Sequence, residues 1–292
     1  YEIEKLFFLK KKDYQKNKHV FITGLPRSGT TALLNFLDKF EELCSLKYKN
    51  MPLILSPNLS KMFNKNKWRS QERFHKDKIF IDLESPESFD EVFFKNFSKE
   101  EIEIELLNFL NLFLNSNNSY RYLSKNNLNY KRIDLILKIL PNSLFLIPIR
   151  NPIQHAYSLL NQHYNFKKLH SLNNFSKRYM KYLGHEEFGD IHKYWNHPQN
   201  FKDTNSLNYW LEQWKFFYLD IYNNYKDKKN CKFIIYENLQ NPDYIKKIEN
   251  FLNLKNTTSN IFELSKKKAI ENYDEDLFHQ TDLIYSKFLE MT

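Results

Sequence analysis

The residues best suited to hold an anion stand in one short loop, 24–29, whose sequence is Gly-Leu-Pro-Arg-Ser-Gly. Two of the chain's 4 glycines lie in it, between a β-type run at 19–23 and apolar residues that recur at helical spacing from Thr30. Glycines let successive backbone N–H groups face one ligand, and the helix N-terminus that follows favours negative charge. A guanidinium suits two oxygens of one phosphate or sulfate group. The pattern therefore predicts an anion site made of Arg27, Ser28, Gly29, Thr30 and Thr31.

The loop has the spacing of a P-loop, G-x-x-x-x-G-K-[ST], but Thr30 stands where that motif has its lysine. This lysine normally contacts the β- and γ-phosphates, so its absence argues against an ordinary ATPase or kinase. One feature still favours a P-loop NTPase or small-molecule kinase. Residues 79–82, Ile-Phe-Ile-Asp, have the form of a strand ending in a magnesium-binding aspartate.

A second arginine follows another β-type run. Residues 144–149 are apolar, Arg150 comes next, and Asn151-Pro152 then has the form of a helix start, with Ser158 eight positions after Arg150. Ligands of doubly wound sheets bind at the carboxyl ends of the strands. If the strands at 19–23 and 144–149 are neighbours, the two arginines would hold the two phosphates of one nucleotide.

Strands and helices alternate along the chain. The β-type runs are 19–23, 78–82, 144–149 and 232–236, and helical patterns cover 30–40, 100–114, 133–140 and 153–165. This order predicts an α/β fold in which a P-loop-like, doubly wound, mostly parallel sheet is flanked by helices. Pro148 cannot donate a ladder hydrogen bond, so we expect its strand at a sheet edge or with a bulge.

The loop and the following Thr30-Thr31 resemble the 5′-phosphosulfate loop of sulfotransferases that use 3′-phosphoadenosine 5′-phosphosulfate (PAPS). The similarity is greatest to the bacterial and tyrosylprotein-type branch, whose loop reads P-R-S-G-T-T. Arg150 and Ser158 resemble the 3′-phosphate motif of that family, an arginine after a strand with a serine eight residues on. The resemblance spans 19–255 and implies one sulfotransferase-like domain over 1–292, with a C-terminal helical segment at 256–292.

Further segments extend the resemblance. Residues 122–127 are similar to a family segment whose lysine, here Lys125, would stabilise charge on the leaving group. Residues 236–239, Tyr-Glu-Asn-Leu, resemble the family's Y-E-D-L strand end and are expected to be architectural. The implied activity is transfer of a sulfuryl group from PAPS to a hydroxyl or amine, with release of adenosine 3′,5′-bisphosphate and no metal.

The general base is not fixed by the motifs. Residues 46–51 contain no acid, although the tyrosylprotein branch has a glutamate in this region. His75 is a candidate because histidine titrates near neutral pH, and Glu84 and Glu87 are the carboxylate candidates. We place His75, Lys125 and Glu87 in the catalytic set. A catalytically inactive nucleotide-binding protein is the further alternative to an enzyme.

Composition limits the other function classes. Lys+Arg 44 against Asp+Glu 35 gives a net charge of +9 over 292 residues, but the lysines are scattered, and no zinc-finger spacing or arginine-rich run indicates nucleic acid. Cys44 and Cys231 are too far apart in sequence for a cysteine-built metal site. No apolar stretch reaches the length of a membrane span. We expect a cytoplasmic bacterial protein with a small-molecule, glycan or peptide acceptor; the first residue, Tyr1, leaves open a removed leader or anchor, and the oligomeric state stays open.

Overall fold

A computed structural model describes residues 1–63, 70–72, 80–255, 262 and 272–292. Its main β-sheet has five strands in the order β2-β5-β1-β6-β7. The pairings of β5 with β1 and with β2 are parallel. These strands are β1 (Val20–Ile22), β2 (Cys44–Ser45), β5 (Tyr122–Lys125), β6 (Leu144–Ile149) and β7 (Cys231–Ile235).

Hydrogen bonds also join β1 and β6. The backbone N–H of Leu144 donates to the carbonyl oxygen of His19. Four residues after His19, just past the end of β1, the Thr23 N–H donates to the carbonyl oxygen of Leu146, so the pairing advances in the same direction along both strands. The two strands that precede the predicted anion-binding segments are therefore neighbours, and the predicted mostly parallel α/β sheet is confirmed.

By its contacts the chain divides into two compact units. The first comprises Tyr1–Ile22, Thr31–Phe145 and Leu252–Thr257, and the second Thr23–Thr30, Leu146–Phe251 and Thr258–Thr292. Strand β6 contributes residues to both. The domain limits expected from the sequence stay a prediction.

An aromatic cluster forms much of the core of the first unit. Phe109 and Phe113 on α5 pack against Tyr122 of β5, which also contacts Phe21 of β1. Burial of such rings is a large favourable term in folding. The helices of this unit are α1 (Glu2–Phe8), α2 (Thr30–Leu37, with Thr30 in the second unit), α3 (Pro57–Phe63), α4 (Asp90–Asn96), α5 (Ile102–Ser116) and α6 (Ile133–Ile139), with 3₁₀ turns η1 (Tyr48–Asn50) and η2 (Asn127–Arg132).

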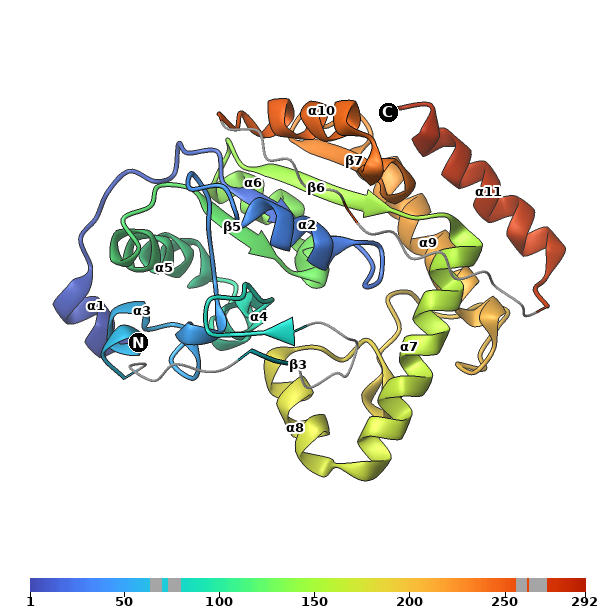
Figure 1. The fold of residues 1–292 in the computed structure, drawn as a ribbon, viewed down its shortest axis with the longest axis horizontal. Helices are drawn as coiled ribbons and strands as arrows, with labels where there is room; N and C mark the ends of the chain where they lie inside the picture. The colour runs from blue at the N-terminus through green and yellow to red at the C-terminus, as the bar shows by residue number, and fades with distance from the viewer. Residues whose placement is uncertain (64–69, 73–79, 256–261, 263–271) are drawn as a thin grey trace. The chain divides into compact units, whose positions relative to one another are not determined.

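The second unit is built on a long helix, α9, which packs against α7 and α11. Trp210 and Trp214 of α9 are fully buried in this helical core. Strand β6 runs into the N-terminus of α7 with one short turn between them (Figure 1). The helices are α7 (Pro152–Leu172), α8 (Asn174–Leu183), α9 (Leu207–Tyr225), α10 (Pro242–Leu252, with Leu252 in the first unit) and α11 (Glu275–Leu289), with 3₁₀ turns η3 (Gly189–Ile191) and η4 (Tyr236–Gln240).

The strand expected at 78–82 is not part of the main sheet. Within the described residues it reduces to β4 (Phe80–Ile81), which pairs antiparallel with β3 (Gln71–Glu72) in a separate two-stranded sheet. The pattern at 78–82 predicts a strand but does not show which partner the strand takes. Asp82 therefore does not end a strand of the parallel sheet, as a magnesium aspartate of a P-loop NTPase would.

The position of Pro148 also differs from expectation. Strand β6 lies between β1 and β7, so it is internal rather than at an edge. Leu144 donates toward β1, and Pro148, four residues on, faces the same side. Strand β1 ends at Ile22, so the missing N–H of Pro148 falls beyond the last ladder position, where the chain turns away at Gly24. Pro148 therefore disrupts little of the hydrogen bonding between β6 and β1.

The start of helix α7 agrees with the prediction, and its end does not. It begins with the predicted Asn151 cap, whose side chain accepts from the N–H of Gln154, and it continues to Leu172, past the predicted end at 165.

None of the described helices is long and apolar enough to cross a membrane.

Candidate functional site

The glycine loop takes a conformation that needs left-handed backbone at three positions. Gly24, Arg27 and Gly29 have φ values of 144°, 70° and 106°. The Ser28 hydroxyl donates to the carbonyl oxygen of Leu25 at 2.7 Å, which closes the loop on itself. Ser28 is fully buried, whereas Arg27 is exposed. The loop therefore exposes its one guanidinium while the Ser28 hydrogen bond holds its backbone in place.

Gly29 is enclosed by the ring of Tyr236, the first residue of η4. A Cβ built on Gly29 would lie 2.7 Å from Cδ2 of that ring. A Cβ on Gly24 would meet only ordinary contacts, the nearest being the Pro148 carbonyl oxygen at 3.4 Å. Both glycines need positive φ, but only Gly29 also needs the space.

We therefore expect Gly29→Ala to be more damaging than Gly24→Ala. Each substitution carries backbone strain of about 1–2 kcal/mol, and Gly29→Ala adds an overpacking cost of about 1–3 kcal/mol against Tyr236. Thermal unfolding of the two variants compares them directly, because Gly24→Ala is the matched control for positive φ. Equal losses of Tm would show that the Tyr236 contact is unimportant.

Arg150 lies in the turn between β6 and α7 and is only 4% exposed. Its Cζ atom is 4.9 Å from the centre of the same Tyr236 ring that covers Gly29. Burial lowers the pKa of Arg150 from its usual value, against the raising effect of Tyr236 and Glu237. Arginine remains charged in proteins, so this side chain is a desolvated cation for which a bound anion would be a favourable partner.

Two hydrogen bonds join the glycine loop directly to α7. The Arg27 Nε–H donates to Oγ of Ser158 at 3.4 Å. The side chain of His155, one helical turn before Ser158, bonds through Nε2 to the carbonyl oxygen of Pro26 at 2.8 Å. The residues predicted from two segments more than a hundred positions apart thus meet in the second unit.

The charges of both arginines act on one buried imidazole, that of His155. Burial lowers the pKa of His155 to about 3, and the charges of Arg150 and Arg27 act in the same direction. Because the Pro26 carbonyl can only accept, Nε2 carries the proton and Nδ1 is bare in the neutral ring. Among the described residues Nδ1 has no hydrogen-bond partner. The neutral imidazole of His155 holds the loop to α7 through its hydrogen bond to Pro26 without adding a third positive charge.

This burial predicts acid sensitivity. His19 and His163 share the effect, since burial lowers the pKa of each to about 4. A depressed histidine pKa gives stability that is present above the unfolded value of about 6.5 and is lost as pH falls below it. When the pH falls from 7.5 to 5.5, we expect each of these three histidines to lower the free energy of unfolding by about 1.4 kcal/mol.

Urea unfolding at the two pH values measures this loss. His155→Gln should remove about a third of the pH dependence attributed to these three histidines, and His279→Gln, which changes an exposed histidine on α11, should leave it unaltered. A His155→Gln variant with the full pH dependence would contradict the assignment.

Glu237 holds the turn that carries Arg150. One carboxylate oxygen accepts from the N–H of Asn151 at 2.9 Å, and the other from the hydroxyl of Tyr285 on α11 at 2.8 Å. Tyr236 and Glu237, expected to be architectural, thus contact the loop, the Arg150 turn and the C-terminal helix. Local spacing could not reveal this role, because the partners are distant in sequence.

The predicted lysine lies in the first unit, at the carboxyl end of β5. Lys125 is 7% exposed and is paired in register with Ile22, the last residue of β1. The glycine loop leaves β1 directly after Ile22. The sequence did not predict β5 as a strand, because its polar residues Ser124 and Lys125 are buried with the others.

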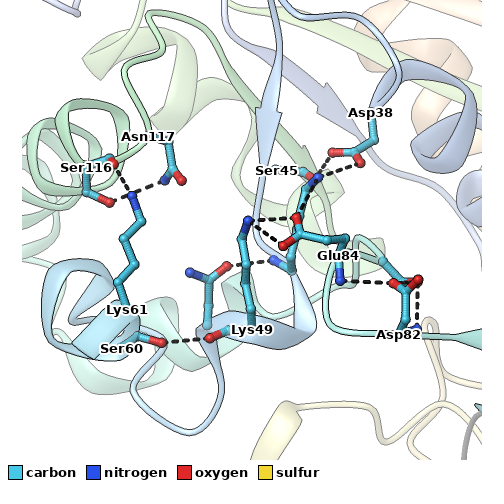
Figure 2. A network of polar contacts seen from close by, with 12 residues as sticks. Asp38, Ser45, Lys49, Ser60, Lys61, Asp82, Glu84, Ser116 and Asn117 are labelled. Carbon is cyan, nitrogen blue, oxygen red and sulfur yellow. Dashed lines mark hydrogen bonds and ion pairs between the residues drawn. The ribbon is translucent and has the colours of Figure 1, made fainter. Parts of the chain in front are cut away.

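Glu87 and Thr31 line a common cavity in the first unit, with a volume of ≈ 310 Å³. The Glu87 carboxylate accepts from the Tyr48 hydroxyl at 3.0 Å and from the N–H of Ser88 at 2.9 Å. Glu84 lines the same cavity and pairs with Lys49 (Figure 2). His75 lies outside the described residues. No three His, Cys, Asp or Glu side chains form a metal-binding group in the part of the chain that the structure covers.

Comparison with known proteins now identifies the family. A sequence model described as the sulfotransferase family matches residues 19–257, which include both arginine segments. The chain belongs to the sulfotransferase family. No curated protein matches this sulfotransferase.

Three bacterial sulfotransferases are among the solved structures to which this sulfotransferase is similar, each at low sequence identity. STF9 from Mycobacterium avium has 14% identity and a TM-score of 0.49, over 94% of this chain and 77% of that one. STF1 from Mycobacterium tuberculosis H37Rv has 13% identity and a TM-score of 0.46, over the same shares. A sulfotransferase from Alicyclobacillus acidocaldarius has 14% identity and a TM-score of 0.43, over 94% of both chains.

Proposed function

We propose that the protein transfers a sulfuryl group from PAPS to a hydroxyl or amine and releases adenosine 3′,5′-bisphosphate. The observation that carries the proposal is the hydrogen bond between Arg27 and Ser158, supported by the effect of Arg27 and Arg150 on one buried imidazole. Two cationic segments at the carboxyl ends of neighbouring parallel strands suit a ligand with two separate anionic groups. Membership of the sulfotransferase family supports PAPS as that ligand.

In this proposal each anionic group has its own residues. Arg27, with the backbone and hydroxyl donors of Ser28, Gly29, Thr30 and Thr31, holds the 5′-phosphosulfate. A guanidinium fork and a helix N-terminus both favour such an anion. The 3′-phosphate is held by Arg150 and Ser158, and the requirement for that phosphate excludes ATP as the preferred nucleotide.

The reaction moves one sulfuryl group and one proton. The acceptor oxygen or nitrogen forms a bond to sulfur while the bond from sulfur to the 5′-phosphate oxygen breaks, and the acceptor proton passes to the general base. Lys125 stabilises the negative charge that develops on the leaving phosphate. Glu87 is the candidate base among the described residues, and His75 is the other candidate. The proposal uses no metal.

A kinase is less well supported. Its evidence was the strand at 79–82 with Asp82 as a magnesium ligand, and β4 lies in the separate antiparallel pair instead. The other alternative is an inactive nucleotide-binding protein. Measuring whether the protein turns over an acceptor distinguishes this alternative from an enzyme. The acceptor class, whether small molecule, glycan or peptide, and the cytoplasmic location stay predictions.

The test is transfer of label from ³⁵S-PAPS to a panel of a sugar, a phenol and a tyrosine peptide. We expect labelled product from at least one acceptor together with an equal amount of adenosine 3′,5′-bisphosphate. Phosphoryl transfer from ATP and magnesium in place of this reaction would establish the kinase alternative. Nucleotide binding without turnover of any acceptor in the panel would favour the inactive one.

Two substitutions assign the base. Loss of a general base lowers kcat by about 100-fold or more without weakening nucleotide binding. We expect this result for Glu87→Gln and not for Glu84→Gln, which changes the other carboxylate candidate in the same cavity. A large loss for Glu84→Gln alone would assign the base to Glu84. If His75→Ala has the large effect and Glu87→Gln does not, the base is His75.

A further inference from the structure

The peptide that joins Pro26 to Arg27 leads into an unusual backbone conformation. Arg27 has a φ value of 70°, in the left-handed region that residues with a side chain rarely adopt. Its side chain is exposed, so packing of that side chain into the core does not impose this conformation. Backbone strain of this kind persists only where the surrounding structure holds it. Other contacts of the loop must therefore fix the backbone at Arg27.

The carbonyl of Pro26 makes such a contact. Its oxygen accepts a hydrogen bond of 2.8 Å from Nε2 of His155, on α7. The Pro26 carbonyl and the Arg27 nitrogen belong to one planar peptide unit, so a bond that fixes this carbonyl restricts the φ of Arg27. The bond from Ser28 to Leu25 acts on a different carbonyl of the loop. His155 therefore acts directly on the backbone that carries the loop's guanidinium.

The side chain of His155 is itself held in a fixed position. It is fully buried and packs against Tyr218 of α9, with 6.1 Å between the two ring centres. The Tyr218 hydroxyl donates to the carbonyl oxygen of Pro148 at 2.9 Å, which anchors this tyrosine at the end of β6. A buried hydrogen bond of this kind is costly to leave unmade. The contact between His155 and the loop is therefore part of the core of the second unit.

Helix α7 holds Arg27 at two points. His155 and Ser158 are three residues apart, so they project from the same face of the helix. His155 contacts the main chain before Arg27, and the Ser158 hydroxyl contacts the guanidinium. Arg150 lies in the turn directly before the same helix. One helix therefore orients the arginine of the loop and follows directly from the turn that carries the other arginine.

We propose that His155 is a positioning residue for the nucleotide and sets the affinity of the loop for the 5′-phosphate through its hydrogen bond to Pro26. In this role the imidazole acts through Arg27 and not by contact with the ligand. An arginine that is already oriented loses little entropy when an anion binds. The inference rests on the proposed function, because it takes the loop as the 5′ site. No motif singles out His155, since its partner is 129 positions away.

Two substitutions of His155 test this role. His155→Phe fills the site with a ring that has no N–H donor, whereas His155→Gln keeps a donor in its side-chain amide. The ligands, titrated by calorimetry, are adenosine 3′,5′-bisphosphate and adenosine 3′-phosphate, which lacks the 5′ group. We expect His155→Phe to weaken binding of the bisphosphate by about 10-fold and to leave adenosine 3′-phosphate within about twofold. His155→Gln should keep the bisphosphate affinity within about threefold of the original.

His163→Phe is the matched control. His163 is a second buried histidine of α7, and its Nδ1 accepts from the N–H of Gly189 in η3 instead of from the glycine loop's surroundings. The substitution therefore removes a buried histidine contact from the same helix without touching the Pro26 carbonyl. It should lower the Tm and leave the ratio of the two nucleotide affinities unchanged.

This ratio distinguishes positioning of the loop from a general loss of structure. The inference is overturned if His155→Phe leaves the ratio unchanged, weakens both ligands equally, or is matched by an equal loss in His155→Gln. Failure of the proposed function gives a different result. In that case the unmodified protein would itself bind the bisphosphate no more tightly than adenosine 3′-phosphate.

Discussion

Arg27→Ala is expected to weaken the binding of adenosine 3′,5′-bisphosphate by about 30- to 150-fold. The 5′-phosphate loses the one cation of the loop, and charge-assisted hydrogen bonds to an anion contribute about 2–3 kcal/mol. The guanidinium is already oriented by its hydrogen bond to Ser158. Isothermal titration calorimetry gives the affinity.

Two further variants make this result specific. Arg27→Lys should recover part of the affinity, because an ammonium keeps the charge but cannot form two parallel hydrogen bonds. Arg178→Ala removes an exposed arginine from α8 and should change nothing. An Arg27→Ala protein that binds the bisphosphate as the unmodified protein does would show that the loop is not the 5′ site.

Arg150→Ala should abolish the preference for nucleotides that carry a 3′-phosphate. We expect the affinity for adenosine 3′,5′-bisphosphate to fall by about 30- to 150-fold, while adenosine 5′-phosphate binds within about twofold of its original affinity. Arg150 is almost fully buried beside Tyr236, so its charge is poorly screened by solvent. The ratio of the two affinities is the informative quantity.

If Arg150 had only a structural role, its substitution would change the stability of the protein but not the ratio of the two nucleotide affinities. Arg121→Ala provides the comparison, because Arg121 is a buried arginine that donates to the carbonyl oxygens of Lys18 and Leu252. It should lower the unfolding free energy and leave the ratio intact. Should Arg150→Ala also leave it intact, the 3′-phosphate must be held elsewhere.

The strand, loop and helix around the glycine loop could be predicted because each has a local signal. A β-type run, two glycines in a chain with 4 of them, and helical spacing of apolar residues follow one another within 19–40. The turn that carries Arg150 was equally predictable from the sequence, because an asparagine cap and a proline at the first helical position mark where α7 begins. Both predictions concern residues that are neighbours in sequence.

The errors concern pairing, which local patterns do not encode. The run at 78–82 reads as a strand, but the pattern does not contain its pairing with β3. The short strand β5 was missed, because two of its four buried residues are polar. The contact of Tyr236 with Gly29 and Arg150 joins three segments through space, so no spacing along the chain predicts it.

One titration tests the central claim most directly. The unmodified protein is titrated by calorimetry with adenosine 3′,5′-bisphosphate and, separately, with ATP and magnesium. Because Arg27 and Arg150 are assigned to the two phosphates of one adenine nucleotide, the bisphosphate should bind at least about 10-fold more tightly than ATP. Tighter binding of ATP with magnesium would contradict the assignment of both arginines.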